Sequence, residues 1–199
     1  NVDYHTLKDQ FHIVGKNVVI KKAPSFQTAM GLLNDWPPFG AVQTWENPER
    51  TVLVIDALSS MGRASFNMVL QANNVLGQMG TKGGPEIAHY GAAMENIEKL
   101  LGNITNPDLV PCHLIVLTHV TSQESDGSII RSYPEALGTK LNPKVGRYFN
   151  NMISLSLTGG EKSFKTKKDG LLACKTSRPL ADKYKIETGM AEIFKALTS

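Results

Sequence analysis

The predicted fold follows from two similar segments, Thr51-Val-Leu-Val-Ile-Asp56 and Leu114-Ile-Val-Leu-Thr-His119. Both are short apolar runs rich in β-branched residues, and each ends in a polar residue. Continuous apolar runs are typical of strands that are covered on both faces, as in parallel sheets. Because ligands of open α/β sheets lie at the carboxyl ends of the strands, Asp56 and His119 mark the edge where we expect a site.

Helical patterns lie between and around these two strands. In the segment 90–101, Ala93, Ile97, Leu100 and Leu101 recur at helical spacing, and Gly102 follows as a stop. Further helices are predicted over 25–36, 63–78, 134–145 and 188–197. Strands that alternate with helices predict an α/β fold with a mostly parallel sheet flanked by helices.

The C-terminal third has a different pattern. The polar segment 121–133 is predicted to be a loop, whereas 151–157 and 170–175 have the composition of late strands. A turn at Gly159-Gly160, with a lysine-rich tip, would join these strands into an antiparallel addition to the sheet. The chain has no internal repeat and no low-complexity linker, so residues 1–199 are expected to form one domain.

Composition excludes several classes of protein. The chain has 199 residues, of which 41% are hydrophobic and 20% charged, as in a globular domain with a core of its own. Its two cysteines, Cys112 and Cys174, are far apart, which excludes a disulfide scaffold and suits a reducing cytosol. The apolar runs are too short for a membrane-spanning helix, and the polar first ten residues predict no secretory signal.

Charge is spread unevenly along the chain. The net charge is +3 in total, but residues 140–185 hold 11 basic and 3 acidic side chains, a local net charge of +8. Such a segment indicates either a surface for a polyanion or a solvated lysine-rich face. Its first basic residues, Lys140, Lys144 and Arg147, are candidates for contact with DNA phosphates.

Asp56 has the sequence context of a Walker B carboxylate, because four apolar residues precede it. A strand would hold this carboxylate at the sheet edge, where it can bind Mg²⁺ directly or through water. The matching phosphate-binding motif GxxxxGK[ST] is absent around Lys16 and Lys82. Ser59 has no GxSxG context, which disfavours a hydrolase triad. His119 is either a sensor of the terminal phosphate or a satisfied histidine at a strand end.

Several motifs in a fixed order carry a family resemblance. They are Thr51-Val-Leu-Val-Ile-Asp56-Ala-Leu-Ser59-x-Met-Gly62-Arg63-Ala, Tyr90-Gly91-Ala-Ala, Leu-Ile-Val-Leu-Thr118-His119-Val, Tyr133-Pro134-x-Ala-Leu-Gly138-x-x-Leu, Arg147-Tyr148-Phe149-Asn150 and Glu187-Thr188-Gly189-Met-Ala-x-Ile-Phe194. In this order they resemble the phage RecA-like (AAA-type) nucleotide-binding ATPases, which are similar to the single-strand annealing recombinases of the RecA/RadA superfamily. The resemblance covers most of residues 2–197.

The resemblance implies a RecA-like sheet that binds ATP and Mg²⁺ at its strand ends. Asp56 would be the metal-binding and catalytic carboxylate, Ser59 would contact the nucleotide, and His119 would link the terminal phosphate to a DNA-binding loop. Lys175 and Arg178 would reach the ATP of a neighbouring subunit in a homo-oligomer. A plain surface hairpin is the alternative for these two residues.

The resemblance also implies single-stranded DNA as the partner and the cytoplasm of an infected host as the location, with no membrane. Its first DNA loop corresponds to residues 62–89, with Arg63 and Lys82, and its second to 121–138, with Arg131.

The sequence departs from the family's pattern. The family's phosphate-binding loop is not found in this sequence and is expected before Asn1, and Glu46 and Glu49 are poor candidates for the family's catalytic carboxylate. ATP hydrolysis is therefore expected of the complete protein. Three functions remain open: ATP-dependent single-stranded DNA binding in phage recombination or annealing, a non-catalytic RecA-like remnant that binds DNA or protein, and a RecA-like helicase motor.

Overall fold

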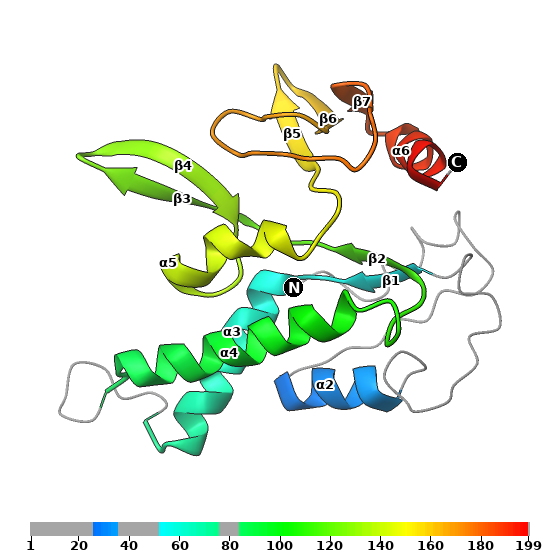
Figure 1. The fold of residues 1–199 in the computed structure, drawn as a ribbon. Helices are drawn as coiled ribbons and strands as arrows, with labels where there is room; N and C mark the ends of the chain where they lie inside the picture. The colour runs from blue at the N-terminus through cyan, green and yellow to red at the C-terminus, as the bar shows by residue number, and fades with distance from the viewer. Residues whose placement is uncertain (1–25, 36–51, 76–83, 199) are drawn as a thin grey trace.

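The computed structural model describes residues 26–35, 52–75 and 84–198 (Figure 1). Its elements, in chain order, are α2 (Phe26–Asp35), β1 (Val52–Ile55), α3 (Leu58–Ala72), α4 (Ile87–Ile104), β2 (His113–Val116), β3 (Val120–Ser125), β4 (Ser128–Pro134), α5 (Gly138–Leu141), the 3₁₀ helix η2 (Asn142–Arg147), β5 (Ser154–Thr158), β6 (Glu161–Lys165), β7 (Lys183–Lys185) and α6 (Gly189–Thr198). The α/β class is confirmed.

The two predicted central strands exist and pair in parallel, with Val52 opposite His113 and Ile55 opposite Val116. The prediction of a mostly parallel sheet is wrong, however. Within the described ranges, β1 and β2 are the only strands that pair in parallel, and no extended RecA-like sheet is present. Leu53 is buried, but Val52 and Val54 are exposed. The apolar run therefore belongs to a strand covered on one face, and its continuity misled the prediction of a larger sheet.

The core lies between β1–β2 and the helices α3 and α4, with α2 beside them (Figure 1). The residues predicted to face inward from α4, namely Ala93, Ile97, Leu100 and Leu101, are all buried. The predicted helices that became α2, α4 and α6 are confirmed with small changes of length. In the described part of the chain, no helix combines the length and apolar character needed to cross a membrane.

Helix α3 begins earlier than its predicted start at residue 63. The backbone N–H of Leu58 donates to the carbonyl of Leu117, which ties the first turn of α3 to the end of β2. Further along α3, the buried Ser65 hydroxyl donates to the Ala93 carbonyl of α4 at 3.1 Å and accepts from Asn96 at 3.3 Å. These bonds fix how α3 and α4 cross.

The prediction of a polar loop over 121–133 is wrong, because β3 and β4 form an antiparallel hairpin there. The chain reverses at Asp126-Gly127, where φ is 51° and 74°. Two positive φ angles are the signature of the tight hairpin turn that Asp-Gly favours. β3 is mostly polar, and the two large apolar residues of β4, Ile129 and Ile130, are adjacent and exposed. The apolar alternation that usually reveals a strand is therefore missing. The tip of the hairpin points away from α3 and α4 (Figure 1).

The segment 134–145 does not form the single helix that was predicted. Pro134 ends β4, and the chain then forms α5 and the 3₁₀ helix η2, with Pro143 near the start of η2. The buried side chain of Asn142 accepts a hydrogen bond from the backbone N–H of Ala136 at 2.9 Å. This bond holds the connection that follows β4 against the start of η2.

The late antiparallel strands are confirmed, but with a different partner for the first of them. β5 pairs with β6 across the turn Gly159-Gly160, and β6 pairs with β7. The strand predicted over 170–175 is wrong, because Leu172 and Lys175 there form only isolated bridges. β6 was not predicted as a strand, because charged residues occupy much of its sequence and leave no apolar pattern.

A partly buried ion pair closes this C-terminal unit. The Asp169 carboxylate accepts hydrogen bonds from Lys165 Nζ and Ser154 Oγ, both at 2.7 Å. The hydrogen bond from Lys165 lowers the pKa of Asp169 below its ordinary value near 3.8. A carboxyl whose pKa is lower in the folded than in the unfolded state stabilises the fold above the unfolded value. That stabilisation is lost as the pH falls through the folded value.

We therefore expect Asp169→Asn to reduce the free energy of unfolding at pH 7 and to flatten its decline between about pH 5 and pH 2. Urea unfolding at a series of pH values measures both effects. Asp108→Asn, at an exposed turn residue, is the control. Parallel curves for wild type and Asp169→Asn would contradict the prediction.

Candidate active site

The polar residues at the carboxyl ends of β1 and β2 lie together, as predicted. Asp56 directly follows β1 and is exposed, and Ser59 lies in the first turn of α3. His119 follows β2, whose parallel pairing places its end beside that of β1. The Ser59 hydroxyl and His119 Nδ1 are 2.9 Å apart, so a hydrogen bond links the two strand ends.

A fourth residue, Glu135, completes this group and was not predicted. Its backbone N–H donates to the His119 carbonyl at 2.8 Å, and its carboxylate lies 3.9 Å from His119 Nδ1. The Thr118 hydroxyl donates to the Glu135 carbonyl. We call Asp56, Ser59, His119 and Glu135 the strand-end cluster. The only sequence signal for Glu135 was its place after Pro134, between two motifs of the resemblance.

The cluster lacks the geometry of a serine hydrolase. A triad needs the serine on one ring nitrogen of the histidine and the carboxylate on the other. Here Ser59 and Glu135 both approach Nδ1 of His119.

The two cysteines are poor nucleophiles as well. Burial raises the pKa of the Cys112 and Cys174 thiols, so neither offers a thiolate at neutral pH. The cluster is thus a hydrogen-bonded link whose exposed carboxylate, Asp56, is the group most available to a ligand.

The side chains of the strand-end cluster can bind Mg²⁺ only if phosphate oxygens supply further ligands. No three His, Cys, Asp or Glu side chains gather into a metal site in the ranges that the structure describes. Mg²⁺ is commonly held by one or two carboxylates plus phosphate oxygens and water, and Asp56 can supply one of these ligands. Among the described residues, no lysine or arginine bonds to Asp56, Ser59 or His119. The described part of the cluster therefore supplies no positive charge for a triphosphate.

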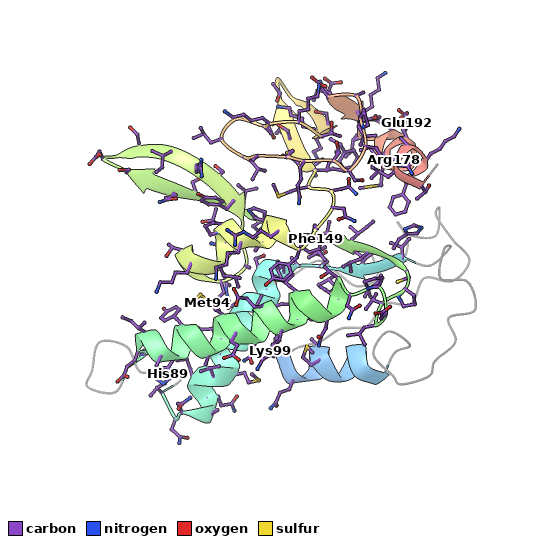
Figure 2. All side chains as sticks on the ribbon, viewed as in Figure 1. His89, Met94, Lys99, Phe149, Arg178 and Glu192 are labelled. Carbon is purple, nitrogen blue, oxygen red and sulfur yellow. The ribbon has the colours of Figure 1, made fainter. Side chains whose placement is uncertain are left out.

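The two predicted nucleotide-contacting cations lie elsewhere in the fold. Lys175 is exposed, and its backbone pairs with that of Met152 next to β5. Arg178, labelled in Figure 2, is exposed and lies in the connection between β6 and β7. Both belong to the β5–β7 unit, and neither bonds to the strand-end cluster. Contact with a neighbouring subunit's nucleotide stays a prediction for both.

The predicted DNA-binding residues that the structure describes are distributed over four elements. Lys82 lies outside the described residues. The others are placed as follows: exposed Arg63 on α3, exposed Arg131 on β4, and exposed Lys140, Lys144 and Arg147 on α5 and η2. Lys144 forms an ion pair with Glu98 of α4 at 3.0 Å, so part of its charge is already neutralised. The sites at Arg63 and Arg131 have no such partner among the described residues.

Local charge limits where phosphates can bind. The β3–β4 hairpin carries Glu124 and Asp126 against the single cation Arg131. In the β5–β7 unit, three lysines are ion-paired. The pairs are Lys165–Asp169, Lys167–Asp182 and Lys183–Glu161. The basic segment is therefore less available to a polyanion than its formal charge indicates.

Comparison of this chain with protein-family models, with curated proteins and with solved structures finds no match.

Proposed function

We propose that the protein is a RecA-like, ATP-dependent single-stranded DNA-binding protein of phage recombination or annealing. The observation that supports this most directly is the Ser59–His119 hydrogen bond at the edge where Asp56 follows β1. It joins the first turn of α3, three residues after the Walker B-type Asp56, to the strand end that leads into the β3–β4 hairpin. That hairpin is the proposed second DNA-binding element.

The residues of this chain would divide the work between them. Asp56 would hold Mg²⁺ through one carboxylate ligand, exposed at the strand end. Bound with ATP, the metal would neutralise phosphate charge during transfer to water, without a covalent intermediate. Ser59 would orient the His119 ring. A movement of His119 would then shift the base of the β3–β4 hairpin, because the backbone N–H of Glu135 is bonded to the His119 carbonyl.

A non-catalytic RecA-like remnant that binds DNA or protein is the second candidate. The absence of a lysine or arginine bonded to the described strand-end cluster favours it, because a triphosphate needs positive charge close to its oxygens. A helicase motor is a variant of the first proposal and differs from it by ATP-driven strand displacement.

Fluorescence anisotropy of a labelled oligo-dT strand, titrated with the protein with and without Mg·ATP, tests the proposal. We expect the Kd for DNA to fall by about tenfold with Mg·ATP, which corresponds to a coupling free energy of about 1.4 kcal/mol. An equal Kd in both conditions would support the remnant instead. Strand displacement from a forked duplex with ATP would support the helicase.

A further inference from the structure

We propose that Tyr90 is a stacking platform for a base of single-stranded DNA, an inference that rests on the proposed function. The ring of Tyr90 on α4 stacks on the ring of Phe66 on α3, with centroids 4.2 Å apart and planes 28° apart. Neither residue belongs to the strand-end cluster. The platform would add a base contact to a site for which the sequence predicted only phosphate contacts.

The platform is exposed, unlike the rest of the α3–α4 contact. Tyr90 is 42% exposed, and Ile87, one turn earlier on the same helix, is 85% exposed. The stack lies at the first turn of α4, the end that the label His89 marks in Figure 2. The backbone N–H of Glu86 donates to His89 Nδ1 at 2.9 Å, which orders this turn. An ordered and exposed aromatic ring loses little freedom when a base stacks on it.

The groups beside the platform are those that contact a nucleic acid backbone. Arg63 precedes Phe66 by three residues on α3, so the two side chains are neighbours on the helix surface. Arg63 is exposed and forms no ion pair with a described residue. It also lines a surface pocket of about 300 Å³, part polar and part apolar, with Gln27, Asn67 and Met68. Aromatic stacking next to a cation and amides is how proteins bind single strands without sequence preference.

A protein partner fits this surface less well than a single strand does. Stable protein interfaces bury about 800 Å² on each partner around an apolar centre. At the start of α4 the exposed large apolar residues are Ile87 and Tyr90, among the residues that the structure describes. Two such residues next to an arginine match the footprint of one or two nucleotides.

The test compares two strands of equal length, oligo-dT and a fully abasic strand, which carries the same phosphates but no bases. Anisotropy gives the Kd of each strand for wild type and for Tyr90→Ala, Tyr90→Leu and Tyr90→Phe. We expect wild type to bind oligo-dT at least about fivefold more tightly than the abasic strand. Tyr90→Ala and Tyr90→Leu should lose most of that preference, with unchanged binding of the abasic strand, and Tyr90→Phe should keep it.

Leu155→Ala is the matched control, because Leu155 is a 62% exposed apolar residue on β5, outside the platform. It should bind both strands as wild type does. An unchanged preference in Tyr90→Leu would overturn the platform and leave the proposed function standing. If Tyr90→Ala or Tyr90→Leu weakened binding to both strands equally, the platform would be overturned in favour of a packing role for Tyr90. If either variant changed the oligomer mass, the platform would be overturned in favour of an interface between copies of the chain. Failure of wild type to bind either strand would overturn the platform and the proposed function together.

Discussion

In the complete protein, Asp56→Ala is expected to lower the rate of Mg²⁺-dependent ATP hydrolysis by at least about 100-fold, the usual effect of removing one preorganised electrostatic contact. Asp56 is exposed, directly follows β1, and bonds to no other described residue, so its removal should leave the fold intact. Asp56→Asn should have a similar effect, because an amide keeps the shape but loses the charge that Mg²⁺ requires. Phosphate release under saturating ATP measures the rate.

Asp108→Ala provides the control for this experiment, since Asp108 is exposed and only its backbone N–H takes part in a described hydrogen bond. Its turnover should equal that of wild type. Unchanged turnover in Asp56→Ala would contradict the assignment of Asp56 as the metal-binding carboxylate. No turnover above background in wild type would favour the non-catalytic module, which predicts DNA or protein binding that is indifferent to ATP.

Local patterns in the sequence predicted local structure well. The helical spacing of Ile97, Leu100 and Leu101 identified the buried face of α4, because packing on one side leaves an apolar stripe of period 3.6. The polar residues that end the two apolar runs, Asp56 and His119, were correctly expected at one edge. That expectation needed only parallel pairing of two adjacent strands, which the structure confirms.

Features set by long-range pairing were not predictable in the same way. The extent of the parallel sheet depends on which strands meet, and an apolar run reports only that a strand is at least partly buried. Glu135 joins His119 through its backbone, a contact to which any residue could contribute, so its identity carried no signal. The hairpin at Asp126-Gly127 did have a signal, the turn dipeptide itself, but its strands lacked the apolar alternation that would have supported it.

Gly62 links the stability of the fold to the strand-end cluster, because its lack of a side chain allows α3 to approach the chain after β4. A Cβ atom at this position would lie 1.9 Å from the Ala136 carbonyl oxygen and 2.8 Å from the carbonyl carbon. These are backbone atoms, and the N–H of Ala136 is held by Asn142. The clash cannot be relieved by a side-chain rotation, so the segment next to Glu135 would have to move.

Gly62→Ala should therefore lower the free energy of unfolding by about 3 kcal/mol, which for a domain of this size lowers Tm by on the order of 10 °C. Gly91→Ala is the matched control. Gly91 is also helical, on α4, and a Cβ there meets nothing within 4 Å. Because alanine favours a helix over glycine by about 1 kcal/mol, this variant should be as stable as wild type or more so. Thermal and urea unfolding of the two variants must therefore shift in opposite directions, or at least separate widely. If they coincided, α3 would not lie as close to residues 135–137 as the fold requires, and the position of Glu135 beside His119 would be in doubt with it.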